Sequence, residues 1–144
     1  MRVEITRIDP DLELPSYANE GDAGMDLRSR IDCEIAPGER KLIPTGIAIA
    51  IPKGFVALAH PRSGLAIKSG IAMVNAPGTI DSGYRGELQI ILINHDLKET
   101  FYIKRGDRIA QLLIQAVEIA ELVEVDALPD SQRGAMGFGS SGQR

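Results

Sequence analysis

One loop of the sequence places a carboxylate where it could activate a water molecule. Asp81 lies in VNAPGTIDSGYRGELQI, residues 74–90, which reads as strand, loop and strand. A loop carboxylate can orient and deprotonate water, but Asp is also a common turn residue, so Asp81 alone allows both interpretations. Tyr84 is either a binding side chain or an ordinary surface aromatic, and Asn75 could simply cap the strand end. The glycines of this segment predict turns at Gly78, Gly83 and Gly86.

The segment HPRSGLAIKSG, residues 60–70, combines a cation with a hydroxyl at the start of an expected helix. Residues 63–69 form the one plausible short helix, opened by a serine cap at Ser63. A helix N-terminus with Arg62 and a serine hydroxyl beside it suits a phosphate group. The alternative is a capping serine next to a solvent-facing arginine, and this segment alone favours that alternative.

Two polar residues in apolar or small-residue surroundings could complete such a site. Asp26 lies in GDAGMDLRS, residues 21–29, where two aspartates flank small residues in an irregular segment. Mg²⁺ needs few carboxylates when water and phosphates supply its other ligands, so one aspartate could suffice. Solvated loop acids are the alternative, and it is stronger for Asp22 than for Asp26. Gln111 interrupts the apolar run GDRIAQLLI, residues 106–114, and points either to solvent or into a site.

The last 16 residues differ in composition from the rest, with four glycines and three serines. We therefore expect a domain over residues 1–128 and a flexible Gly/Ser-rich arm over residues 129–144. GFGSSG, residues 137–142, matches the dinucleotide-binding pattern G-x-G-x-x-G. That pattern requires a helix directly after it and an acidic residue about 20 positions further on, and the sequence has neither, which excludes Rossmann-type binding. A disordered chain end is the ordinary interpretation. Arg133 and Phe138 favour a functional arm instead, because a linker needs neither.

The elements that position these residues are short runs rich in Val and Ile between turn residues. Fifteen glycines and eight prolines leave little room for long helices. Alternation of apolar residues predicts strands, and the run 88–93 is expected to be buried on both faces. The expected strands cover residues 47–51, 55–59, 71–75, 88–93, 108–114 and 115–125. This pattern predicts an all-β chain, a distorted jelly roll or β-barrel-like double sheet with one short helix.

Size and charge exclude several classes of function. The chain has 144 residues, one domain's length, and a net charge of −4, which argues against binding duplex nucleic acid but not against binding a small anion. Cys33 is the one cysteine, so no internal disulfide can form, and the cytoplasm is the expected compartment. No apolar run approaches the roughly 20 residues that span a membrane. The two histidines, His60 and His95, have no zinc-like spacing.

In order along the chain, five segments resemble the five motifs of the trimeric dUTPase family. These segments are AGMDLRS (23–29), PRSGLA (61–66), NAPGTIDSGYRGE (75–87), GDRIAQLL (106–113) and RGAMGFGSSG (133–142). The resemblance runs from about residue 17 to residue 142, and five motifs in one order make it specific. The departure is Ser140-Ser141, where a Ser-Thr pair is commoner, and both pairs supply hydroxyls.

The resemblance implies a magnesium-dependent dUTP diphosphatase. Such an enzyme hydrolyses dUTP to dUMP and pyrophosphate by attack of water on the α-phosphate, which removes dUTP and supplies dUMP for dTTP synthesis. It also implies a homotrimer of jelly-roll subunits in which each active site is built from all three chains. The arm would close over the bound nucleotide as a lid.

The family's roles for the base, the sugar and the reaction carry over to matching positions. Asp81 is expected to orient and activate the attacking water, with Gln111 and Ser63 completing the catalytic set. Tyr84 is expected to stack on the deoxyribose and to leave no room for a 2′-hydroxyl. Phe138 is expected to cover the uracil ring. The residues expected to bind the uracil edge are Asn75, Gly78, Thr79, Ile80 and Asp81, with Gln89 nearby.

The roles for the phosphates and the metal carry over in the same way. Asp26 is expected to reach Mg²⁺ through bound water, Gln111 to hold the α-phosphate and Arg133 to meet the γ-phosphate. The other residues expected to contact phosphates are Arg62, Ser63, Gly64, Gly139, Ser140 and Ser141.

Two other functions remain as alternatives. A dCTP deaminase shares the fold and the trimer, but that family uses a glutamate for deamination and lacks the TIDSGYRG pattern found here. A non-catalytic nucleotide-binding jelly-roll module is the second alternative. A pure binder would not need Asp81, and this favours the enzyme.

Overall fold

The computed structural model describes residues 1–132, 134 and 135. In this part of the chain short strands dominate, and the one helix has seven residues, too few to cross a membrane. The elements are β1 (Glu4–Arg7), β2 (Met25–Arg28), β3 (Cys33–Ile35), β4 (Arg40–Pro44), β5 (Ile47–Ala50), β6 (Phe55–His60), α1 (Ser63–Ser69), β7 (Ile71–Met73), β8 (Gly78–Ile80), β9 (Gln89–Asn94), β10 (Phe101–Ile103) and β11 (Arg108–Ala116).

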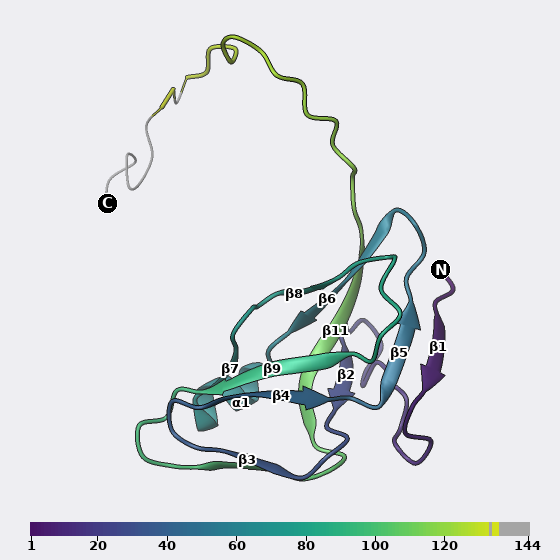
Figure 1. Cartoon of the computed structure of the whole chain (residues 1–144), viewed down its shortest axis with the longest axis vertical. Helices are drawn as coiled ribbons and strands as arrows, with labels where there is room; N and C mark the ends of the chain where they lie inside the picture. The colour runs from purple at the N-terminus through teal and green to yellow at the C-terminus, as the bar shows by residue number, and fades with distance from the viewer. Residues whose placement is uncertain (133, 136–144) are drawn as a thin grey trace.

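The strands form two main sheets that enclose one aliphatic core. One sheet has the order β2-β11-β6-β8 and the other β4-β9-β7, while β1 pairs with β5 and β10 with β3. All of these pairs are antiparallel. In Figure 1, β4 and β9 cross in front of β11. Both sheets contribute to a single buried cluster, so the expected all-β double sheet of jelly-roll type is confirmed.

Alternation along the strands explains which side chains fill this core. Ile47, Ile49 and Ile51 are 3%, 4% and 2% exposed, as their spacing predicts. Burying an aliphatic side chain of this size contributes about 1.5–3 kcal/mol, so these three, on β5 and directly after it, fix which face turns inward. The run 88–93 is fully buried on one face only. Its other face carries the exposed Gln89 and half-buried isoleucines, which corrects the expectation of a strand buried on both faces.

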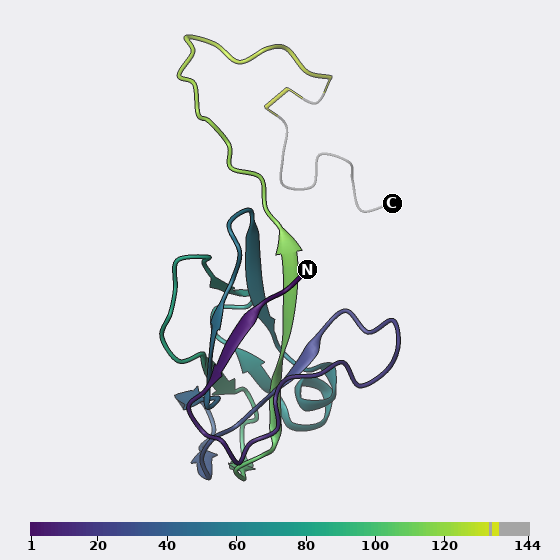
Figure 2. The same cartoon turned by 90° about the vertical axis from the view of Figure 1, so that its right-hand side faces the viewer.

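Two expected strand ends are wrong. The strand expected over residues 115–125 stops at Ala116, the last residue of β11. Ala116 pairs with Phe55, where the neighbouring strand β6 begins, so β6 offers no partner to the residues after Ala116. Residues 117–132, all described, contain no helix or strand and run away from the sheets in Figures 1 and 2. The strand expected over residues 71–75 stops at Met73.

Asp9 ties the N-terminal segment to the turn before β11. Arg105 donates to both of its oxygens, from Nη2 at 2.7 Å and from Nε at 3.2 Å. This hydrogen-bonded guanidinium lowers the pKa of Asp9 below the ordinary value of 3.8. A carboxyl whose pKa is lower in the folded chain stabilises the fold above the unfolded pKa, and that contribution is lost as the pH falls.

We therefore expect Asp9→Asn to lower the melting temperature at pH 7 and to lower it less as the pH drops below 3.8. Thermal unfolding of parent and variant at several pH values measures this difference. Asp11→Asn is the matched control, since Asp11 lies two residues away and, among the described residues, its carboxylate acts on Arg105 only through its charge, without a hydrogen bond or ion pair. A melting-temperature difference that stays constant with pH would contradict the assignment.

Candidate active site

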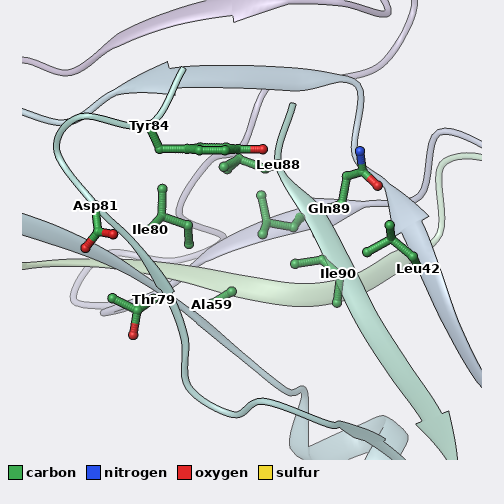
Figure 3. Close-up of a pocket in the computed structure, with 10 residues that line it drawn as sticks. Leu42, Ala59, Thr79, Ile80, Asp81, Tyr84, Leu88, Gln89 and Ile90 are labelled. Carbon is green, nitrogen blue, oxygen red and sulfur yellow. The ribbon is translucent and has the colours of Figure 1, made fainter. Parts of the chain in front are cut away.

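An apolar pocket of about 360 Å³ opens beside the loop that joins β8 to β9. The register places Gly78 of β8 opposite Ala59 of β6, so two small residues meet where larger side chains would fill the space. Gly78 therefore begins a strand, which corrects the expectation of a turn there. We call this cavity the apolar pocket. Its lining residues are Leu27, Leu42, Ala59, Thr79, Ile80, Asp81, Tyr84, Leu88, Gln89 and Ile90 (Figure 3).

The loop after β8 presents Asp81 and Tyr84 at the mouth of this pocket. The Tyr84 amide donates to the Asp81 carbonyl at 3.0 Å, which closes a turn between them. Asp81 is exposed, and its carboxylate has no hydrogen-bond or ion-pair partner within residues 1–132, 134 and 135. Tyr84 is 45% exposed, and its ring extends across the pocket with the hydroxyl toward Leu88 (Figure 3). An unpaired carboxylate at a pocket mouth is free to accept a proton from water.

A second pocket, of about 390 Å³, is polar and lies around the start of α1. Four residues expected to contact phosphates line it, together with the aspartate expected to reach magnesium. We call this cavity the polar pocket. Its lining residues are Ala18, Asn19, Asp22, Ala23, Gly24, Asp26, Arg62, Ser63, Gly64, Arg108 and Gln111.

Asp26 sits between two guanidinium groups in the polar pocket. Its Oδ1 is 3.1 Å from Nε of Arg62, and its Oδ2 is 3.2 Å from Nη1 of Arg108. Arg62 also donates from Nη1 to the Arg108 carbonyl at 3.2 Å. Asp26 lies on β2 rather than in an irregular segment, so its position is fixed by the strand. The two guanidinium groups and the carboxylate together carry a net positive charge, which suits an anionic ligand.

Gln111 points into the polar pocket and not to open solvent. Its Nε2 donates to the Pro61 carbonyl at 3.0 Å. A Cβ added at Gly24 would lie 2.5 Å from its Oε1, so the amide in this orientation occupies the space that a side chain at position 24 would take. Nε2 has a second N–H, which can donate to a ligand.

Arg108 is the candidate site residue that sequence reasoning missed. In a regular strand Arg108 and Gln111 would face opposite sides, because they are three residues apart. The pairing of β11 with β2 shifts between Arg108 and Ala110, so two residues oppose one there. This bulge buries Ile109 and Ala110 in succession and brings Arg108 onto the face of Gln111.

The start of α1 differs in one detail from the expectation. Arg62 is the N-cap residue, with φ −97° and ψ 124°, and no side chain caps the helix. Ser63 is the first helical residue, so its hydroxyl does not serve as a cap. The bounds of the helix, Ser63–Ser69, are as expected, and it ends at Gly70 with φ 62°. The first backbone N–H groups of a helix have no acceptor within it, which leaves them available to a ligand.

The two pockets lie on opposite faces of the same sheet. Leu27 and Ala59 line the apolar pocket, whereas Asp26 and Gln111 line the polar pocket. Asp26 and Leu27 are neighbours on β2, and consecutive side chains of a strand point to opposite faces. Ala59 pairs with Leu112, the residue after Gln111, so β6 and β11 show the same division. The expected site is therefore split within one chain.

The remaining expected site residues are placed less directly. Asn75 lines neither pocket, but a Cβ added at Gly78 would be 3.4 Å from its Nδ2, so the amide lies beside β8. The expected residues outside the described part of the chain are Arg133, Phe138, Gly139, Ser140 and Ser141.

The described residues offer no ready-made metal centre. In residues 1–132 and 134–135 no three His, Cys, Asp or Glu side chains are grouped closely enough to hold a metal ion. The polar pocket supplies the Asp26 carboxylate, 22% exposed, beside two arginines. Mg²⁺ that is held mainly by phosphates and water needs no more than one such carboxylate. This donor set fits an ion that arrives with an anionic substrate.

Known proteins resemble this chain along nearly its whole length. The sequence model of the dUTPase family matches residues 11–142. The deoxyuridine 5'-triphosphate nucleotidohydrolase of Thermobifida fusca is 60% identical, over 99% of this chain and 79% of that protein. The protein of the same name from Mycolicibacterium gilvum is 58% identical, over 96% and 93% of the two chains.

Solved structures agree with this. The dUTPase of Staphylococcus bacteriophage 80alpha with dUPNHPP superposes with a TM-score of 0.90 at 29% identity, over 98% of both chains. A mutant dUTPase of phage phi11 of S. aureus, whose structure shows a structural Mg(II) ion, has a TM-score of 0.83 at 26% identity over 90% of this chain and all of that one. The chain belongs to the dUTPase family.

Proposed function

We propose that this chain hydrolyses dUTP to dUMP and pyrophosphate, which removes dUTP and supplies dUMP for dTTP synthesis. The observation that carries this function is the pairing of an exposed loop carboxylate at an apolar pocket with an arginine-rich polar pocket, in a member of the dUTPase family. The substrate is a free nucleotide, consistent with the net charge of −4, and we place the reaction in the cytoplasm.

The apolar pocket would hold the nucleoside. The backbone N–H and C=O groups of residues 78–81 would hydrogen-bond the uracil edge, with the amides of Asn75 and Gln89 beside them. Tyr84 would lie against the deoxyribose and leave no room for a 2′-hydroxyl. Its ring already extends across the pocket, which supports this role (Figure 3).

The polar pocket would hold the triphosphate. Arg62 and Arg108 supply positive charge, and the start of α1 supplies N–H groups and the Ser63 hydroxyl. The free N–H of Gln111 would donate to an α-phosphate oxygen. Preorganised donors of this kind stabilise the charge that develops during phosphoryl transfer.

Asp81 would act as the general base. It would take a proton from a water molecule as the water oxygen bonds to the α-phosphorus, and the bond from that phosphorus to the α–β bridging oxygen breaks. Pyrophosphate leaves with the bond's electron pair. The exposed and unpaired carboxylate supports this role.

Asp26 would hold Mg²⁺ through bound water. When bound, the ion would neutralise charge on the leaving pyrophosphate. Asp26 contributes a second effect of its own, because the same carboxylate orients Arg62 and Arg108 toward the phosphates.

The split between the pockets supports an assembly of several copies. Faces on opposite sides of one sheet cannot enclose one dUTP molecule, so each complete site needs the apolar pocket of one chain and the polar pocket of another. Ile119, Leu122 and Leu128 are 82%, 93% and 84% exposed in the single chain, and a neighbouring copy would cover them. We propose the homotrimer of the family.

The residues from 129 onward would form an arm that closes over the site, with residues 1–128 as the domain. Arg133 would meet the γ-phosphate and Phe138 would cover the uracil. Gly139, Ser140 and Ser141 would surround the phosphates. The motif RGAMGFGSSG, residues 133–142, supports this proposal.

The first test is pyrophosphate release from dUTP, dCTP, dTTP and UTP, each with magnesium and with a chelator. We expect selective release from dUTP that stops when the metal is removed. Release from dUTP that survives the chelator would reject the metal requirement and keep the substrate. No release from dUTP would reject the function. Ammonia from dCTP would then indicate the deaminase, and no reaction with any nucleotide the binding module.

A further inference from the structure

The Tyr84 ring is held in place by its hydroxyl rather than by burial. The side chain is 45% exposed, so packing alone does not fix its rotamer. Its hydroxyl donates to the carbonyl of Glu87, three residues on, at 2.9 Å. The loop therefore curls so that the phenol lies over the peptide between Tyr84 and Glu87.

Gly86 lies directly beneath this phenol. A Cβ added at Gly86 would clash with the phenol oxygen and lie 2.7 Å from Cζ and 3.1 Å from Cε2 of Tyr84. Gly86 does not adopt a left-handed backbone conformation, so its φ does not require glycine. What requires glycine here is the space that the ring occupies.

Glu87 provides a fixed acceptor for the hydroxyl. Its carboxylate accepts the Gly46 amide at 2.8 Å and pairs with Arg30 at 3.3 Å. The next residue, Leu88, is 3% exposed, and its carbonyl accepts both the amide and the hydroxyl of Thr45, at 3.1 Å and 2.7 Å. The backbone of residues 87–88 is thus anchored on the turn between β4 and β5.

We infer that Gly86 and Glu87 are positioning residues for sugar discrimination, forming a seat that holds the Tyr84 ring at the angle that excludes a 2′-hydroxyl. This inference rests on the proposed role of Tyr84. Any side chain at position 86 displaces the ring, and the ring moves more readily than the anchored backbone because it is half-exposed. The displaced ring loses its bond to Glu87 and opens room beside the sugar.

The test compares the ratio of kcat/KM for dUTP to that for UTP in Gly86→Ala and in the parent. We expect the ratio to fall about tenfold or more, the range in which a pocket distinguishes substrates by one small group. Gly83→Ala is the matched control in the same loop, since an added Cβ there meets nothing within 4 Å. We expect Gly83→Ala to keep the parent's ratio.

A double-mutant cycle with Tyr84→Ala separates the seat from a general disturbance of the loop. Adding Gly86→Ala to Tyr84→Ala should change the ratio no further, because the ring on which it acts is gone. An undiminished effect of Gly86→Ala in the Tyr84→Ala background would overturn the seat. If Gly86→Ala fails to fold, Tyr84→Phe carries the test. It keeps the ring but removes the bond to Glu87, and an unchanged ratio would overturn the inference.

Failure of the seat and failure of the proposed role give different results. If Tyr84→Ala keeps the parent's ratio, Tyr84 does not discriminate the sugar and the proposed role is wrong. If Tyr84→Ala lowers the ratio while Gly86→Ala and Tyr84→Phe do not, the role stands and the seat is wrong.

Discussion

We expect Asp81→Asn to lower kcat for dUTP by on the order of a hundredfold or more, the size expected for loss of a general base. Asparagine has almost the same shape, so it keeps the loop turn that the Asp81 carbonyl makes with the Tyr84 amide. Its amide cannot take a proton from water. The expected result is therefore lost turnover with the nucleotide still bound. Single-turnover pyrophosphate release measures the chemical step directly.

The control is the affinity for dUPNHPP, the ligand that accompanies the phage 80alpha dUTPase in its solved structure. We expect it to change little in Asp81→Asn, since the arginines are untouched and asparagine fills nearly the same space in the lining of the apolar pocket, and the melting temperature should match the parent's. Turnover close to the parent's would remove Asp81 from the role of base. Lost affinity together with lost turnover would make Asp81 a binding residue instead.

Local sequence signals predicted the elements that have local causes. The helix over residues 63–69 lies between Pro61 and Gly70. Pro61 disfavours a helical conformation in the residue before it, and the positive φ of Gly70 ends the helix. The strand expected over residues 55–59 appears because its alternation matches a sheet with one buried face. The segment 115–125 was a weaker case, since its periodicity is mixed and, beyond Ala116, it has no partner strand among the described residues.

The candidate site shows a sharper limit. The motifs name residues but not the faces on which they lie. Arg108 was missed because the bulge after it reverses the alternation, and two successive apolar residues, Ile109 and Ala110, are a weak signal for a bulge. The division of the site between two faces depends on how β2, β11 and β6 pair, which is a long-range property.

We expect deletion of residues 133–144 to abolish turnover of dUTP while leaving the fold and the proposed assembly intact. Among the described residues, the buried apolar side chains all lie between Leu12 and Leu112, in the part of the chain that the deletion leaves whole. The melting temperature and the native mass should therefore equal those of the full chain. Turnover should fall because the deletion removes Arg133 and Phe138. The site would lose the positive charge that meets the γ-phosphate and the aromatic cover that excludes water from the nucleotide. The deletion of residues 143–144, which leaves RGAMGFGSSG complete, is the matched control and should keep full activity. A truncated protein that keeps its turnover would refute the lid, and one that loses its native mass would show that these residues hold the assembly together.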